Sequence, residues 1–261
     1  IGKSPNTYQN YFKGFIDEVR LFNKGLSENE LQKMVHQEIT NNAGVIRGDI
    51  IPKDINDYDS LTDTSTPLNW TSLERYYKMD IYKDDIIDDL STNSIDIGSG
   101  CKIFNTKVID VQTAPLPFVT TVSCSGDWTD TNNWIQGDIW NVTGTHTEAA
   151  IVHIQGNMET NSNHSMIGLI LDNGSKLEVN GDSGLFNSWY LKLDGDIDLQ
   201  GESQLIQKVE SSLDLTSSGT LERDQQGTKD LYTYNYWSSP VGVSNTTSNN
   251  NSYTLPDVLR D

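Results

Sequence analysis

The sequence predicts an all-β protein whose second half is a small right-handed parallel β-helix with coils of about 22 residues. Three segments of the form Leu-x-Leu, polar residues and a further apolar residue recur between residues 167 and 223. Leu169, Leu191 and Leu213 occupy equivalent positions 22 residues apart, and an even spacing keeps equivalent strand residues on one face. Short repeats with one apolar face bury that face only by stacking, which favours a solenoid.

Apolar and charged residues alternate along the repeats. The odd positions predicted to point into the coil are Leu169, Leu171, Leu177, Val179, Leu185, Trp189, Leu191, Leu193, Ile197, Leu199, Leu205, Val209, Leu213, Leu215 and Leu221. The even positions predicted to point outward are Lys176, Glu178, Lys192, Asp194, Asp196, Asp198, Asp214 and Glu222. This alternation is typical of strands with one buried face.

Composition excludes some classes of partner. The 261 residues carry 37 acidic and 18 basic side chains, a net charge of -19, so a nucleic-acid backbone would be repelled. No run reaches the roughly 18 apolar residues of a membrane span, and no signal peptide opens the chain. The sequence does not begin with Met, so we expect a piece of a longer protein, and the acidity, the two cysteines and the abundance of Asn, Ser and Thr suggest an extracellular location. We expect Cys101 and Cys124 to pair, which would add about 3 to 4 kcal/mol.

The chain opens with a strand and a helix. Residues 11–23 have apolar side chains on both faces, as in a strand inside a sandwich. Ser27 and Glu30 form the S-x-x-E pattern of a capping box, and apolar spacing extends a helix from Glu28 to Glu38. The run from Phe12 to Leu31 resembles the closing strand and helix of the LamG-like, concanavalin-type jelly roll. That resemblance implies that residues 1–39 are the C-terminal part of such a domain.

Residues 40–118 are predicted to be a loop-rich connector with one or two short strands, because prolines and polar residues interrupt it. A strand is expected at 76–81, weakly similar to the opening of another jelly-roll unit. The β-solenoid is assigned to residues 119–223. Within it, 149–158 form the first coil, and Trp128, Trp134 and Trp140, six residues apart, form an apolar lid over it.

Residues 224–261 are predicted to be a capping strand followed by an Asn- and Ser-rich tail. The strand is expected where Tyr232, Tyr234 and Tyr236 alternate with other residues. The paired tryptophans, the Leu-rich coils and the segment YNYWSSPVG together resemble a module of very large surface proteins of gliding Bacteroidetes. This resemblance covers residues 119–245 and implies export by the type IX secretion pathway, with the translocon as a partner during transit.

Two acidic groups are candidate calcium sites, since calcium prefers carboxylate oxygens. One group is Asp194, Asp196 and Asp198, and the other is Asp84, Asp85, Asp88 and Asp89. The alternative for each is a solvated acidic surface, and neither fits the EF-hand spacing. We expect no basic residue near the first group.

The sequence offers no catalytic constellation. His36, His146, His153 and His164 lack zinc-binding spacing, and no nucleophile elbow or phosphate-binding loop is present. The aromatic residues suit core packing more than a sugar-stacking platform. We therefore expect a non-enzymatic adhesive or motility-associated module, with surface glycans as the candidate ligand and calcium as the candidate cofactor. The alternative is a carbohydrate-active enzyme or its carbohydrate-binding accessory domain, and a third option is a non-binding stalk.

Overall fold

The computed structural model describes residue 14 and residues 16–79, 82–83, 86–91, 101–102, 117–135, 150–224 and 227. Within these residues the protein is mostly β, with one short α-helix. They fall into two compact units. One unit comprises the described residues up to 31 and from 38 to 102, and the other comprises residues 32–37 and the described residues from 117 onward.

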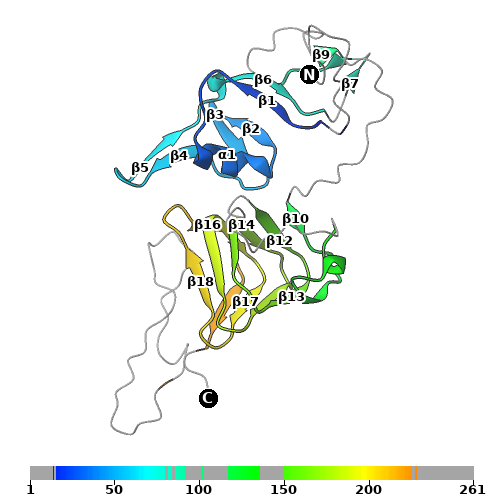
Figure 1. The fold of residues 1–261 in the computed structure, drawn as a ribbon, viewed down its shortest axis with the longest axis vertical. Coiled ribbons are helices and arrows are strands. Elements are labelled where there is room, and N and C mark those ends of the chain that lie inside the picture. Colours follow the sequence, from blue (N-terminus) through cyan, green and yellow to red (C-terminus); the bar gives the residue numbers. More distant parts are fainter. Residues whose placement is uncertain are drawn as a thin grey trace. The chain divides into compact units, whose positions relative to one another are not determined.

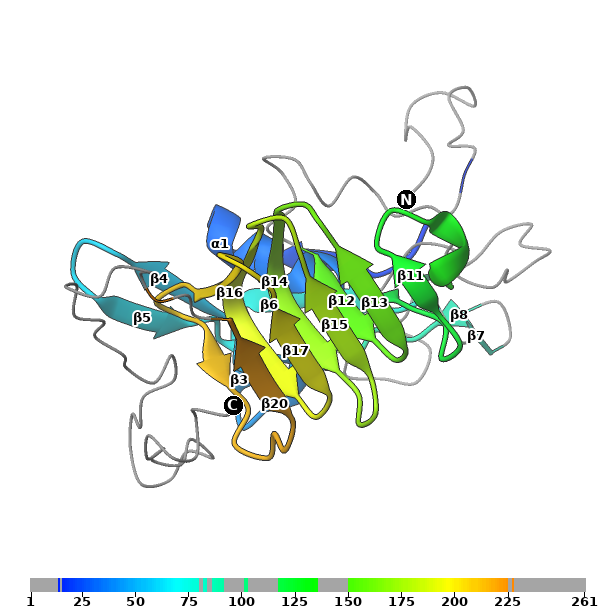
Figure 2. The same cartoon turned by 90° about the horizontal axis from the view of Figure 1, so that it is seen from below.

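The second unit contains a parallel β-solenoid with coils of about 21 residues over residues 151–223, which confirms the predicted fold class (Figure 1). One sheet consists of β10 (Phe118–Val119), β12 (Ile151–Ile154), β14 (His164–Leu171), β16 (Gly184–Leu193), β18 (Gln204–Gln207) and β19 (Ser212–Leu213). The other consists of β11 (Ser125–Asp127), β13 (Asn157–Thr160), β15 (Lys176–Val179), β17 (Asp196–Leu199) and β20 (Thr220–Arg223). Figure 2 shows the strands of this second sheet side by side.

The core of the solenoid is made of apolar columns that run from coil to coil. Leu169, Leu191 and Leu213 are in register across β14, β16 and β19, as the spacing of 22 predicts. The second sheet departs from that spacing. Leu177 pairs with Ile197 after 20 residues, and Ile197 pairs with Leu221 after 24. The turns between strands absorb these differences, and both of these steps are even, so the apolar residues of β15, β17 and β20 remain on the inner face.

A β-bulge in β14 changes which positions point inward. Met166 and Leu169 both belong to the buried core cluster, although one is at an even and the other at an odd position. In the pairing with β16, Met166 aligns with Asn187 and Gly168 with Tyr190, so the register shifts here and the additional residue of that pair lies on β16. The backbone N–H groups of Ile167 and Gly168 both donate to the carbonyl oxygen of Ala150, at 2.8 and 3.4 Å. Two residues of β14 thus face one residue of the preceding coil, and the odd-position rule holds only after this bulge.

The coil predicted to be the first is preceded by a further pair of short strands. β10 and β11 pair in parallel with β12 and β13, so residues 118–127 already form a rung. Trp128 and Trp134 follow this rung and are buried in the core cluster. They meet across the 3₁₀ turn η2 (Thr131–Asn133), not within one extended segment, with ring centroids 5.2 Å apart in an edge-to-face arrangement. Trp140 lies outside the described residues.

The last described coil is less well buried than the others. Leu205, Leu213 and Leu221 are only partly buried against the core. Val209 and Leu215, predicted to point inward, are 77% and 58% exposed. The strands β18, β19 and β20 each pair on one side only, with β16 or β17, because they end the two sheets within the described residues.

The first unit is built from short antiparallel pairs. These are β1 (Val19–Phe22) with β6 (Leu73–Tyr77), β2 (Ile39–Asn42) with β3 (Val45–Gly48), β4 (Asn56–Asp59) with β5 (Thr64–Pro67), and β8 (Ile86–Ile87) between β7 (Tyr82–Lys83) and β9 (Cys101–Lys102). The region predicted to be a connector thus has more strands than expected. The β2–β3 turn has Ala43 and Gly44 at positive φ, as two-residue hairpins require.

Three local expectations in this region change. The helix α1 (Glu28–Val35) ends three residues before Glu38, and Ile39 belongs to β2. The strand expected at 76–81 is β6, which ends at Tyr77, and the described part of the first strand is β1. The capping box is confirmed, because the Glu30 N–H donates to Ser27 Oγ at 3.1 Å and the Ser27 N–H donates to Glu30 Oε2 at 2.9 Å.

No helix in the described part of the chain is long and apolar enough to cross a membrane.

The predicted disulfide between Cys101 and Cys124 is wrong, because Cys124 is not paired. It is a free, buried thiol that packs in the core cluster of the solenoid. A Cβ atom built on Gly156 would lie 2.6 Å from its Sγ atom, so the backbone of the next coil runs close against it. The thiol therefore acts as a small apolar core residue.

Candidate functional site

The outer face of the second sheet carries a column of carboxylates. The register of the sheet aligns one acidic residue from each successive strand. The members of this acidic column are Asp127, Glu159, Glu178, Asp198 and Glu222. Neighbouring strands of a sheet are about 4.8 Å apart, and like charges directly opposite each other are destabilising. The column must therefore be offset by nearby cations, hydrogen-bond donors or solvent.

Lys176 provides part of this offset from the adjacent column. Its Nζ atom lies 2.8 Å from Asp198 Oδ2 and 3.6 Å from Glu178 Oε2. The hydrogen bond to Asp198 is the main cause of a raised pKa for Lys176, so the ammonium group stays charged. Asp127, at the other end of the column, accepts hydrogen bonds from the hydroxyl and the N–H of Thr129, which lower its pKa.

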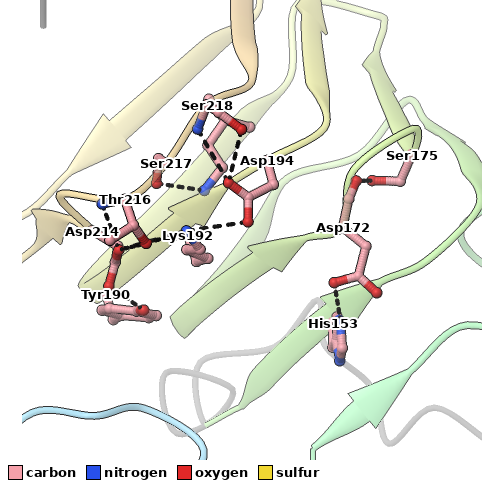
Figure 3. Close-up of polar contacts among 11 residues, drawn as sticks. His153, Asp172, Ser175, Tyr190, Lys192, Asp194, Asp214, Thr216, Ser217 and Ser218 are labelled. Atoms are coloured by element: carbon pink, nitrogen blue, oxygen red, sulfur yellow. Dashed lines mark hydrogen bonds and ion pairs between the residues drawn. The ribbon is translucent and has the colours of Figure 1, made fainter. Parts of the chain in front are cut away.

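A second polar cluster lies where the first sheet ends and the chain turns toward the second (Figure 3). Lys192 Nζ lies 3.1 Å from Asp194 Oδ2 and 3.6 Å from Asp214 Oδ1, and it donates to Thr216 Oγ1 at 2.6 Å. The hydroxyl of Tyr190 donates to Asp214 Oδ2 at 2.7 Å. The contacts to Asp214 and Thr216 join two successive coils, because the residues they connect are 22 or 24 apart in sequence.

The charge of Asp214 is stabilised by this cluster. Burial is the largest single influence on its pKa and acts to raise it. Hydrogen bonds from the hydroxyl and N–H of Thr216 and from Tyr190, with the positive charge of Lys192, together outweigh burial and lower the pKa to about 2. The carboxylate is therefore a fixed anion that holds the coil turns together.

His153 and Ser175 both contact Asp172, but through different atoms. The Nε2 atom of His153 lies 2.7 Å from Asp172 Oδ1, whereas the hydroxyl of Ser175 donates to the backbone oxygen of Asp172 at 2.7 Å (Figure 3). A nucleophile–base pair requires a hydrogen bond between the hydroxyl and the imidazole. This geometry instead closes the turn that follows β14.

The first predicted calcium group is divided among separate contacts. Asp194 Oδ1 accepts from the N–H of Ser218 at 3.1 Å, and Asp196 Oδ1 accepts from the hydroxyl of Thr220 at 2.5 Å. Asp198 is buried and also accepts from Gln200 at 2.8 Å. Asp196 and Asp198 lie on β17, and Asp194 precedes this strand.

The expectation that no basic residue lies near this group is wrong. Lys176 contacts Asp198, and Lys192 contacts Asp194. Lys192 is only two residues from Asp194 in the sequence, whereas Lys176 on β15 reaches Asp198 on β17 because these two strands pair in the second sheet. The sequence carried a signal for Lys192 alone, because Lys176 aligns with Asp196 after 20 residues and not after the 22 of the repeat.

The second predicted calcium group lies partly outside the described residues, which include neither Asp84 nor Asp85. Asp88 is exposed. Asp89 is buried, its Oδ2 atom lies 3.3 Å from Arg75 Nε, and its Oδ1 atom accepts hydrogen bonds from the N–H groups of Tyr76 and Ser91. Across all described residues, no group of three or more His, Cys, Asp or Glu side chains is arranged to hold a metal ion.

The fold and these sites define the chain as a mostly β protein with a parallel β-solenoid of about three turns and an acidic, regularly spaced outer face. No family model, no curated protein and no solved structure matches the chain.

Proposed function

We propose that the chain is a non-enzymatic module of a large secreted cell-surface protein, an adhesin or a motility-associated cargo of type IX secretion. Two sequence resemblances support this proposal: the LamG-like run of residues 12–31 and the YWSSP-containing module of residues 119–245. The net charge of -19 and the Asn-, Ser- and Thr-rich composition fit an extracellular location. During export, the translocon is the expected partner.

The observation that carries the proposal is the in-register acidic column. Every strand of the second sheet adds one carboxylate at the same lateral position. A repeated, evenly spaced row of one kind of side chain suits multivalent contact with an extended, repeating ligand, because each weak contact raises the effective concentration for the next. Surface glycans are ligands of this kind.

Calcium is the cofactor that we propose for such binding. The column offers the carboxylate oxygens that this ion prefers, and the ion would bridge them to glycan hydroxyls. Lys176 holds Asp198 and Glu178, so an ion at that point would compete with its ammonium group. The exposed members Glu159 and Glu222 are therefore the favoured positions.

The test is to apply the full chain to immobilised polysaccharides with calcium or with a chelator, and to record both retention and new reducing ends. We expect retention without cleavage, abolished by chelator. The double substitution Glu159→Gln and Glu222→Gln should weaken retention. Glu202→Gln, an exposed acidic residue outside the column, is the matched control and should not.

Each other outcome has a clear meaning. New reducing ends would replace the proposal with the carbohydrate-active enzyme. Retention that depends on calcium but survives the double substitution would move the site away from the acidic column. No retention on any polysaccharide would leave the module as a structural stalk and would reject its adhesive role.

A further inference from the structure

Glu18 is the centre of a polar cluster in the first unit, at the point where the chain enters β1. Its Oε2 atom accepts a hydrogen bond from the hydroxyl of Tyr76 on β6 at 2.8 Å and forms an ion pair with Arg20 on β1. The side chains of Glu18 and Arg20 are 14% and 12% exposed, and Tyr76 is buried. The N–H of Ile39, at the start of β2, donates to the same Tyr76 hydroxyl at 3.4 Å. The cluster thus links three strands.

The two carboxylate oxygens of Glu18 have different surroundings. Tyr76 and Arg20 both donate to Oε2, whereas Oε1 is buried and has no hydrogen-bond partner among the described residues. A buried carboxylate oxygen without a donor is costly. A proton on Oε1 would remove the charge and leave both donors in place on Oε2. Arg20 also lies over the ring of Tyr76, 5.6 Å from its centroid, so its position does not depend on the charge of Glu18 alone.

The neighbouring charges act on Glu18 in opposite directions. Arg20 favours the ionised carboxylate, and Glu38, which is paired with Lys78, disfavours it. Burial is the largest influence and outweighs the donors, so the pKa of Glu18 is raised above its ordinary value of 4.5. Burial, with the charge of Glu18, also raises the pKa of Tyr76, so its hydroxyl stays protonated. Glu18 is therefore the member of the cluster that changes charge on the acid side of neutral pH.

The backbone at Glu18 depends on these contacts. Its φ is +50°, in the left-handed region that residues other than Gly rarely adopt, and such a conformation persists only where the surroundings hold it. The N–H of Glu18 donates to Asp17 Oδ1 at 3.0 Å. β1 has four residues and, among the described strands, pairs with β6 alone. The side chain of Glu18 thus holds the chain at the start of a short strand.

We propose that Glu18 is a proton-controlled latch on β1: the neutral acid holds β1 on β6, and loss of the proton loosens the strand. Because the raised pKa means that the folded chain binds this proton more tightly than the unfolded chain, the β1–β6 pair gains stability as the pH decreases through that pKa. The gain is complete below the ordinary value of 4.5. This inference does not rest on the proposed function, since the cluster lies in the first unit and the acidic column in the second.

The test is hydrogen exchange of the full chain, measured by mass spectrometry, with Glu18→Gln and the unmodified chain compared at each pH. Gln is the uncharged counterpart of the protonated acid. At pH 7, we expect the amides of β1 to exchange at least about fivefold more slowly in the variant, because its latch stays closed. The difference should narrow steadily as the pH decreases toward 4.5. The amides of β3 should keep their protection in both proteins, which shows that the first unit remains folded.

Asp57→Asn, which removes a carboxylate from an exposed position on β4, is the matched control and should leave the exchange of β1 unchanged at every pH. Faster exchange of β1 in Glu18→Gln at pH 7 would overturn the proposal, because Glu18 would then act as a permanent anion for Arg20. A difference of the same size at pH 7 and pH 4.5, zero included, would also overturn it.

A direct titration keeps the inference testable if the variant loses the protection of β3. The carboxyl carbon of Glu18 in the unmodified chain can be followed by NMR as the pH changes. A midpoint above 4.5 supports the proposal, and a midpoint at or below 4.5 overturns it.

Discussion

The indole ring of Trp128 stacks on the imidazole ring of His164, with ring centroids 4.2 Å apart and planes inclined by 21°. Both side chains are buried, and His164 Nε2 lies 2.6 Å from the hydroxyl of Thr160. The indole N–H of Trp134 donates to the backbone oxygen of Trp128 at 2.9 Å. Residues from a turn and from two different strands thus form one plug at the first end of the solenoid.

Replacing Trp128 with Ala should therefore cost the solenoid about 3 to 5 kcal/mol of unfolding free energy, as for a fully buried aromatic residue. Denaturant unfolding followed by circular dichroism measures the change. Val122→Ala, in the same segment but 76% exposed, should shift stability by no more than about 0.5 kcal/mol. If both variants behaved alike, Trp128 would not be part of the core.

The leucine columns allow a second prediction. Leu191→Ala and Leu193→Ala should each cost about 2 to 5 kcal/mol, because both residues are buried between neighbouring coils. Val209 also has an odd number and was predicted to point inward, but it is exposed, so Val209→Ala should lower the free energy of unfolding far less. A loss below about 1 kcal/mol at both leucines, measured by urea unfolding, would be evidence against a stacked core.

The sequence was informative about the solenoid because its signal is periodic. The spacing of Leu169, Leu191 and Leu213 matches the register of the first sheet, and the alternation of Lys176 to Val179 matches β15. Periodicity did not reveal the bulge at Ile167, because a bulge is defined by the neighbouring strand and not by its own residues. In β12 and β13, which precede this bulge, the residues in the core cluster, such as Val152, Ile154 and Met158, therefore have even numbers.

The candidate site was less accessible to sequence reasoning. The acidic character of Asp194, Asp196 and Asp198 was evident, but their partners come from other coils. Lys176 and Ser218 reach these carboxylates only when the coils stack. In the first unit, short hairpins such as β4–β5 follow no repeat, and polar residues hide their strand pattern. The number of strands there was underestimated for this reason.

Close packing of turns gives a third prediction. A Cβ atom on Gly195 would lie 2.4 Å from the backbone oxygen of Ser175 and 2.6 Å from that of Asp172. Gly195→Ala should destabilise the solenoid by about 1 to 3 kcal/mol, since backbone atoms cannot move aside cheaply. Gly25→Ala is the control, because its Cβ would meet no atom within 4 Å. Equal melting temperatures of the two variants would contradict the close stacking of these turns.

The lowered pKa of Asp214 gives the last prediction, a dependence of stability on pH. A carboxyl whose pKa falls to about 2 on folding stabilises the folded state fully above its unfolded pKa of about 3.9. That contribution disappears as the pH decreases toward 2. Asp214→Asn should therefore be less stable than the unmodified chain at pH 6, and the difference should shrink steadily between pH 4 and pH 2.

Urea unfolding of both proteins across this pH range measures the difference. Glu202→Gln, an exposed turn residue, serves as the control and should track the unmodified chain throughout. The opposite result, a gap between the Asp214→Asn variant and the unmodified chain that is the same at pH 2 and pH 6, would mean that the carboxylate charge does not stabilise the turns. Lys192, Thr216 and Tyr190 would then act on Asp214 through packing alone, and the cluster in Figure 3 would have no electrostatic role in joining the coils.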